Sequence, residues 1–404
     1  MTGPGANGAA VPTPQLNRKH DAMKDETKLT RLGRPHDERG QVNPSVARGS
    51  TMLAPSASAL YDFPPGRKHY GRIGLETHDA LRGALTELQG GAGCALTSSG
   101  LMANTLSILA ATEAGGEVLA ADCIYGPVRN FLLTQLARFG VTTRFFAPRM
   151  GAEIADLITD KTQAILLESP GSLTMELQDV PAIAKIAREK GVITIIDDTW
   201  SAGLTLKPLQ LGVDYAVQAL TKYVGGHSDL LMGAVVARDE ALFQRLQTTE
   251  RAFGFHTGPD DAYLALRGLR SMGVRMQRSA ESSLAIADWL AAREGVGAIR
   301  HPARPDHPDH AIFKRDFTGA CGLFAFEVPG WDIPTSERFL DALEVFGMGF
   351  SWGGYESLAI HCDPQLKRSK TEHKHDGALI RLSIGLEAPE DLIADLERGF
   401  KAAT

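Results

Sequence analysis

The feature that most constrains the fold of this chain is an alternation of amphipathic helices and short apolar segments that begins at about residue 76. The helical periodicity and the β-branched and aromatic runs predict an α/β fold, in which helices cover both faces of a mostly parallel sheet. Ligands of such sheets bind beyond the carboxyl ends of the strands, which makes those ends the candidate site. The predicted helices span 76–89, 101–112, 127–140 and 181–191, and the predicted strands span 94–99, 117–122, 141–148, 163–169, 192–198, 215–220 and 233–238.

A different pattern follows Gly273. One long helix leads into a loop rich in proline and histidine, and strands and helices then alternate at lower density, which predicts a smaller α+β domain. A chain of 404 residues is too long for one ordinary hydrophobic core, in agreement with two folded domains. The predicted segments are the helix 274–293, the loop 301–310, the strands 322–328 and 379–386, and the helices 336–346 and 390–400.

Charge and hydropathy exclude several classes of protein. The 42 lysines and arginines and 48 aspartates and glutamates give a net charge of −6, and no dense basic run is present, so we expect no nucleic-acid partner. No apolar stretch is long enough to cross a bilayer, and we expect no membrane association. Residues 1–20 lack the apolar core of a secretory signal, and their glycine, proline and alanine content predicts a disordered tail. We therefore expect a cytoplasmic enzyme.

The cysteines and a histidine cluster do not predict a metal site. Cys94, Cys123, Cys321 and Cys362 are far apart in the sequence and form no CxxC pair, which predicts free thiols. His301, His307 and His310 lie among prolines and aspartates, a composition that predicts a solvated connection between domains. We predict no bound metal.

Two features at predicted strand ends suit an anion and a planar ring. The segment SSGLMA joins a strand to a helix, and the N–H groups of Gly100 and Leu101 would point at an anion at the helix N-terminus. An ordinary N-cap by Ser98 or Ser99 explains the same residues. Tyr125 opens the next helix, where its ring could cover a planar ligand, although a core or capping tyrosine is equally compatible.

Two further strand ends carry charge. Asp197 ends the apolar strand VITIIDD, and Lys222 follows the strand YAVQAL, with Gly225 and Gly226 behind it. A buried ammonium is costly unless it is paired or chemically committed, but a lysine whose stem packs while its head reaches water fits the local sequence too. If the two strands are neighbours, both side chains face one crevice. Asp197 could then pair with a pyridinium nitrogen, and the Lys222 amine could react with an aldehyde. Together with an anion site and an aromatic ring, they describe a site for pyridoxal 5'-phosphate (PLP).

The chain also resembles the bacterial cystathionine β-lyases, a branch of the PLP-dependent family of cysteine and methionine metabolism. The resemblance extends from about residue 30 to the C-terminus, and its most specific blocks are SPGSLTMELQDVP and SWGGYESL, because γ-acting relatives generally carry a SPTNP-like sequence in place of SPGSL. The other matching blocks are HYGRIGLETHDAL, ELQGGAGCALTSSGLMAN, IIDDTWSAG, LTKYVGGHSD, RDFTGACGLFAFEV and LIRLSIGLE.

The resemblance implies the fold type I of PLP-dependent transferases, which is the aspartate-aminotransferase fold, with a large seven-stranded sheet domain and a smaller C-terminal domain. The implied divisions are an N-terminal tail and intersubunit arm at 1–74, a PLP-binding domain at 75–270 and a small domain at 271–404. It also implies a homotetramer, a dimer of dimers with shared active sites.

The resemblance further implies roles for individual residues. Lys222 is the lysine that joins covalently to PLP and transfers protons, Asp197 is the partner of the pyridine nitrogen, and Tyr125 stacks on the ring and assists in catalysis. Gly100, Leu101 and Thr221 bind the phosphate together with Tyr70 and Arg72 of a neighbouring subunit. Arg381, with Ser351 and Trp352 nearby, holds the substrate α-carboxylate.

The implied reaction is β-cleavage of an amino-acid thioether, chiefly L-cystathionine to L-homocysteine, pyruvate and ammonia, a step of methionine biosynthesis. Other cysteine S-conjugates are expected substrates as well. Two departures bear on this: Asp198 replaces the asparagine often found after the pyridine-binding aspartate, and Phe350 stands where a tyrosine is expected. The alternatives are a γ-acting enzyme, namely a cystathionine γ-synthase, cystathionine γ-lyase or methionine γ-lyase, and a non-catalytic protein of the same fold.

Overall fold

The computed structural model describes residues 23–35, 40–62, 64, 67–370 and 375–404. The predicted disordered tail at 1–20 lies outside these residues. Within the described part, no helix is long and apolar enough to cross a membrane.

The larger of two sheets has seven strands in the order β1-β7-β6-β5-β4-β2-β3. All neighbours from β6 to β3 are parallel, and β7 runs antiparallel to both β1 and β6. The prediction of a mostly parallel seven-stranded sheet is therefore confirmed. Its strands are β1 (Gly93–Thr97), β2 (Glu117–Ala121), β3 (Thr142–Phe146), β4 (Thr162–Glu168), β5 (Ile193–Asp197), β6 (Tyr215–Ala219) and β7 (Gly233–Ala237).

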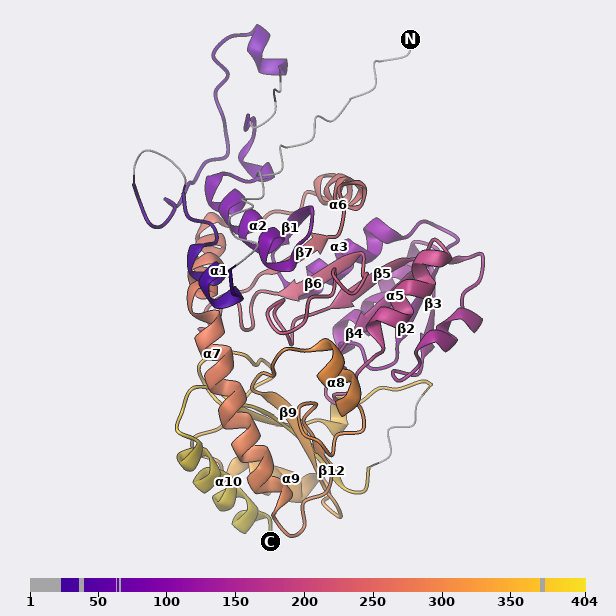
Figure 1. The fold of residues 1–404 in the computed structure, drawn as a ribbon, viewed down its shortest axis with the longest axis vertical. Coiled ribbons are helices and arrows are strands. Elements are labelled where there is room, and N and C mark those ends of the chain that lie inside the picture. The colour runs from indigo at the N-terminus through magenta and orange to yellow at the C-terminus, as the bar shows by residue number, and fades with distance from the viewer. Residues whose placement is uncertain (1–22, 36–39, 63, 65–66, 371–374) are drawn as a thin grey trace.

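Helices pack on this sheet and form one large core with it (Figure 1). Local sequence defines their ends: Gly90 terminates one helix with a φ of 70°, and the side chains of Ser99 and Asp179 accept N–H groups at the start of two others. These helices are α2 (Glu76–Gln89), α3 (Gly100–Ala111), α4 (Gly126–Phe131), α5 (Val180–Glu189) and α6 (Glu240–Phe253), with shorter turns at Leu132–Leu136 and Ala152–Asp156.

A smaller sheet lies in the C-terminal part, in the order β10-β11-β12-β9-β8. Its apolar side chains form a second core with those of the helices that cover it. The bounds are β8 (Ile299–Arg300), β9 (Leu323–Val328), β10 (Gly347–Met348), β11 (Leu358–His361), β12 (Ala378–Ser383), α8 (His310–Asp316), α9 (Ile333–Asp341) and α10 (Pro389–Ala403), with a 3₁₀ turn at Asp363–Gln365.

The helix α7 (Pro259–Ala291) runs alongside both sheets for 33 residues, as Figure 1 shows in orange. The sequence pattern predicted only its second part, from residue 274. Pro259 begins the helix because proline suits the first helical turn. The N-terminal segment adds α1 (Asp25–Arg31), which packs on α7, and 3₁₀ turns at Ser58–Tyr61 and Gly71–Ile73.

The prediction that the histidine loop is solvated is wrong for two of its three histidines. His301 and His307 are buried, and burial lowers the pKa of His301 to about 3 and that of His307 to about 4. The His301 ring is hydrogen-bonded to the Ser283 hydroxyl at 3.1 Å, so its polar atoms are used within the fold. The four cysteines are free, as predicted, and all four are buried. No group of three or more His, Cys, Asp or Glu among the described residues could hold a metal ion.

Candidate active site

The strands that carry Asp197 and Lys222 are neighbours. β5 pairs with β6 in parallel, with Asp197 opposite Val217, and Lys222 follows β6 by three residues. The sequence placed Asp197 and Lys222 at one site only if their strands were neighbours, and they are. Both residues lie at the carboxyl edge of the large sheet. A cavity at this edge is lined by residues that include Asp197, Trp352 and Arg381.

Asp197 is held by three hydrogen bonds. Asn104 donates its amide to one carboxylate oxygen at 2.8 Å, and Thr199 donates its N–H at 3.1 Å and its hydroxyl at 2.5 Å to the other. Desolvation raises the pKa of Asp197, and the hydrogen bonds from Thr199 and Asn104 oppose that shift. The carboxyl group is thus fixed in orientation, while its burial makes a cationic partner favourable.

Lys222 carries an amine with a lowered proton affinity. Its Nζ lies 3.0 Å from the Ser351 hydroxyl and 5.2 Å from the centre of the Trp352 ring. Burial, together with the positive charge of Arg381, lowers the pKa of Lys222 to about 8, although Asp197 acts in the opposite direction. A lysine of this kind is partly neutral near physiological pH, as a nucleophile or a general base must be.

Arg381 is a buried guanidinium on β12 of the small sheet. Its Nη2 donates to the backbone carbonyls of Phe350 and Ser351 at 3.1 and 3.2 Å. Burial lowers the pKa of Arg381, and within the described residues no carboxylate forms an ion pair with it. A buried cation without an anionic partner is costly, so the site favours an incoming carboxylate.

Tyr125 precedes α4, and its backbone is fastened to Glu168 at the end of β4. The Tyr125 N–H donates to Glu168 at 2.6 Å. Burial and the charges of Glu168 and Asp197 raise the pKa of Tyr125, while Arg381 lowers it. The Tyr125 side chain is 45% exposed, which leaves its ring accessible to a ligand.

The N-terminus of α3 approaches the same edge. A Cβ at Gly100 would lie 2.4 Å from that of Ala219, so only glycine allows α3 to start this close to β6. The N–H of Met102 is capped by Ser99, whereas the N–H groups of Gly100 and Leu101 have no acceptor among the described residues. Ser99 therefore caps the helix, and the two N–H groups without an acceptor are in the arrangement that an anion site requires.

The Thr221 hydroxyl is bonded to Met232 in both directions, donating to its carbonyl at 3.2 Å and accepting its N–H at 3.1 Å. A phosphate contact would require this hydroxyl to redirect its proton, because a hydroxyl has only one.

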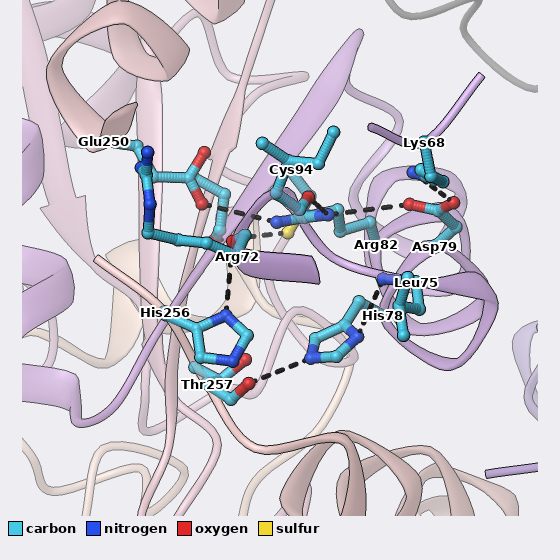
Figure 2. Close-up of polar contacts among 12 residues, drawn as sticks. Lys68, Arg72, Leu75, His78, Asp79, Arg82, Cys94, Glu250, His256 and Thr257 are labelled. Carbon is cyan, nitrogen blue, oxygen red and sulfur yellow. Dashed lines mark hydrogen bonds and ion pairs between the residues drawn. The ribbon is translucent and has the colours of Figure 1, made fainter. Parts of the chain in front are cut away.

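Tyr70 and Arg72 are not part of this cluster within one chain. The Arg72 guanidinium donates to the Arg251 carbonyl at 3.4 Å. The backbone carbonyl of Arg72 lies 3.2 Å from Nδ1 of the His256 ring. Figure 2 shows Arg72 among residues of α2 and of the segment after α6. The Arg72 side chain lines a different cavity, of about 230 Å³.

Three side chains at this site were not predicted from the sequence. Asn104 lies one turn into α3, Thr199 follows Asp197 by two residues, and Glu168 ends β4. Glu168 had a detectable signal, because it is a carboxylate at the end of an apolar strand. Asn104 and Thr199 had none, since their contacts depend on how helix and sheet pack.

The described residues fit PLP. An amine of lowered pKa, a fixed carboxyl group, two N–H groups without acceptors and a half-exposed aromatic ring surround one sheet edge. The fold and the site together define a PLP-dependent enzyme of fold type I. The family model of the Cys/Met metabolism PLP-dependent enzymes matches residues 26–401, and the chain belongs to this family.

Relatives in this family are similar over nearly the whole chain. A putative cystathionine β-lyase of Rhizobium johnstonii is 44% identical over 387 residues, covering 94% of this chain and 96% of that protein. Cystathionine β-lyase MetC of Escherichia coli K12 is 41% identical over 389 residues, covering 93% and 98%. The crystal structure of cystathionine γ-lyase from Lactobacillus plantarum complexed with L-serine superposes with a TM-score of 0.86 at 30% identity, covering 94% of this chain and 99% of that one.

Proposed function

We propose that this protein is a cystathionine β-lyase, which breaks the Cβ–S bond of L-cystathionine and releases L-homocysteine, pyruvate and ammonia with the uptake of one water. The observation that carries the proposal is that Ser351 contacts both an amine and a guanidinium. Its hydroxyl accepts a hydrogen bond from Lys222, and its carbonyl accepts one from Arg381, the proposed carboxylate-binding residue. β-Cleavage requires these two functions side by side, one to move a proton and one to orient the amino acid.

Arg381 is proposed to bind the substrate α-carboxylate. Its Nη2 is fixed by two backbone carbonyls, so the rest of the planar guanidinium can present two N–H groups to a carboxylate. A two-point contact fixes the rotation of the substrate about its Cα, and thereby selects which Cα bond reacts. Ser351 and Trp352 are proposed to complete this part of the site.

Lys222 is proposed to move the proton. Its neutral amine takes the proton from Cα, and the resulting ammonium returns a proton to the departing sulfur. A pKa of about 8 suits both directions, because the group gains and loses a proton readily near neutral pH. When PLP is bound, its pyridine ring supplies the electron sink for the pair left at Cα.

Other side chains are proposed to hold the cofactor. Asp197 would face the pyridine nitrogen, the N–H groups of Gly100 and Leu101 would receive the phosphate with Thr221, and Tyr125 would cover the ring. Supporting this, the Asp197 carboxyl group is held in orientation by Asn104, and two N–H groups at the start of α3 are available.

A γ-acting enzyme is the alternative within the family. The β-lyases named above are 44% and 41% identical to this chain, against 30% for the γ-lyase structure. The products distinguish the two activities. Purified enzyme with PLP and L-cystathionine is expected to form pyruvate and homocysteine, identified by mass spectrometry. Formation of 2-oxobutyrate and cysteine instead would replace the proposal with γ-cleavage.

We also propose that the active sites are shared between subunits of a homotetramer, with residues 1–74 as a tail and arm, 75–270 as the PLP-binding domain and 271–404 as the small domain. The arm exposes large apolar side chains, Leu53 at 91% and Tyr61 at 81%, which favours a covering surface. Arg72 lines a cavity whose walls carry four further cations and two carboxylates, and this excess of positive charge suits a phosphate brought by a neighbouring subunit. The other charged residues of this lining are Arg67, Lys68, Asp79, Arg82, Glu250 and Arg251.

A further inference from the structure

Asp198 is a buried carboxyl group with no role in the site described above. It follows Asp197 in the chain and is fully buried, with an exposed fraction of 0%. Its backbone N–H donates to the Val217 carbonyl at 2.8 Å, which continues the pairing of β5 with β6. The Asp198 side chain has a different set of neighbours from that of Asp197: Gln89, Ser201 and Gln218.

These neighbours are neutral. Gln89 and Gln218 place their amide nitrogens 3.3 and 3.5 Å from one carboxyl oxygen, and the Ser201 hydroxyl donates to the other. Among the described residues, no lysine, arginine or histidine forms an ion pair with Asp198. An ionised carboxylate would therefore be buried with long amide contacts and no counter-ion, an arrangement that strongly disfavours the charge.

The same cluster lacks a hydrogen-bond donor. The side-chain oxygens of Gln89 and Gln218 are both buried, and neither has a partner within the described residues. Buried amide oxygens are normally satisfied. A proton on Asp198 can supply a donor to one of these two oxygens: rotation of that amide by half a turn brings its oxygen to the carboxyl O–H and moves its NH2 group to the place that the oxygen had.

We propose that Asp198 is a neutral carboxylic acid in weakly acidic to neutral solution and acts as a positioning residue for Asp197. A protonated carboxyl group presents a donor and an acceptor side by side, as the amide of an asparagine does, so Asp198→Asn is the neutral counterpart of this state.

The positioning runs through the turn at 198–203. The Ala202 N–H donates to the Asp198 carbonyl at 3.0 Å, and Ala202 has a φ of 52°, a conformation that is unfavourable for a residue other than glycine. The Asp198 side chain holds this turn through Ser201. Thr199, which donates two hydrogen bonds to Asp197, lies within the same turn.

Two charged groups face Asp198. Asp197, the preceding residue, disfavours a second negative charge. Lys207 lies in the following loop, where the charge of Asp198 raises its pKa, but its ammonium pairs with Asp25 at 2.9 Å. Burial is the largest influence and raises the pKa of Asp198 to about 7. The native protein therefore binds a proton that the unfolded chain, with its ordinary pKa, has released.

The sign of the effect on stability follows. Between the ordinary carboxyl pKa and about 7, the folded state binds one more proton than the unfolded state, so the Asp198 contribution to stability falls as pH rises. Above about 7 both states are ionised, and the contribution stays constant. In Asp198→Asn the proton is absent throughout.

The test compares holoenzyme and Asp198→Asn by equilibrium denaturation at pH 5, 6, 7 and 8. The folding constant of the wild type is expected to fall relative to the variant by about tenfold per pH unit from 5 to 7, and to level off above. The infrared spectrum at pH 6 is expected to lose one carboxylic-acid carbonyl band in the variant. Turnover of the variant at pH 6 should stay within about threefold of wild type.

Parallel stability curves together with an unchanged acid band would overturn the inference, since both mean that Asp198 is ionised. Failure of Asp198→Asn to fold would overturn it too, because a neutral acid and an amide are nearly isosteric. Asp198→Leu serves as the contrast: it leaves the glutamines and Ser201 without a partner, so it should lower stability at every pH and weaken PLP binding. None of these readouts depends on which thioether the enzyme cleaves.

Discussion

The Nζ of Lys222 lies 3.0 Å from the hydroxyl of Ser351, whose own carbonyl accepts a hydrogen bond from Arg381 at 3.2 Å. Lys222 follows a strand of the large sheet, while Arg381 belongs to the small sheet. Ser351 therefore joins the proposed proton-transfer group to the proposed carboxylate clamp. Any movement of the small sheet relative to the large one changes the distance between them, so the active site depends on how the two sheets pack.

Lys222→Ala is expected to abolish turnover but not folding. The amine is proposed to take up and return the same proton, and loss of a general acid–base lowers rates by about 10²–10⁴-fold, with more expected because this lysine also anchors the cofactor. The variant should keep the wild-type circular dichroism spectrum and bind PLP weakly through the phosphate. Pyruvate formation at the normal rate would contradict the assigned role.

Arg381→Lys is expected to raise KM steeply. An ammonium cannot reproduce the planar, two-point contact with a carboxylate. The resulting fall in kcat/KM should correspond to a loss of about 2–4 kcal/mol of transition-state stabilisation. The matched control is Arg267→Lys, at an exposed position on α7, which should leave the kinetics unchanged. Steady-state kinetics with L-cystathionine measure this effect. An unaltered kcat/KM in Arg381→Lys would mean that another cation holds the carboxylate.

Lys222→Met is expected to stabilise the apoenzyme near pH 7. Burial lowers the pKa of Lys222 to about 8. At pH values between about 8 and the ordinary lysine pKa, the unfolded chain therefore binds a proton that the native chain lacks. The wild type is therefore penalised at pH 7 and recovers as pH rises through that range. The gain at pH 7 should be on the order of 1–3 kcal/mol.

Urea denaturation of the PLP-free protein at pH 7 and 9.5 measures this difference, which should shrink at the higher pH. Lys401→Met, at an exposed position of α10, is the control and should have no effect at either pH. An equal gain at both pH values would show that packing of the methionine, and not the missing charge, is responsible.

Arg72→Ala and Lys222→Ala are expected to complement each other if the arm serves a neighbouring subunit. Each variant alone should be nearly inactive. Co-expression should restore about a quarter of wild-type activity, because random pairing makes half the dimers mixed, and each mixed dimer has one intact site of two.

The double variant Arg72→Ala/Lys222→Ala co-expressed with wild type is the matched control. With a crossing arm, its mixed dimers have no intact site, and about a quarter of the activity remains, all from wild-type dimers. If Arg72 serves its own chain, mixed dimers keep one site, and about half remains. In that case the two single variants would also fail to complement.

The local sequence was sufficient to predict the large sheet and its site edge. Apolar strands separated by amphipathic helices gave a mostly parallel sheet, because buried parallel strands need helices on both faces. Asp197 and Lys222 could be singled out as candidate site residues because charges at the ends of apolar strands are exceptional. Both rest on patterns that are local in the chain.

Only the tertiary structure decided which residues surround these charges. The contact of Asn104 with Asp197 and that of Ser351 with Lys222 join segments 93 and 129 residues apart. The burial of His301 was misjudged because a loop rich in proline and aspartate can still fold back against the helix that precedes it, here α7 through Ser283. Residue type and spacing report what a segment can do, whereas desolvation and partner choice depend on packing, which is a property of the whole fold.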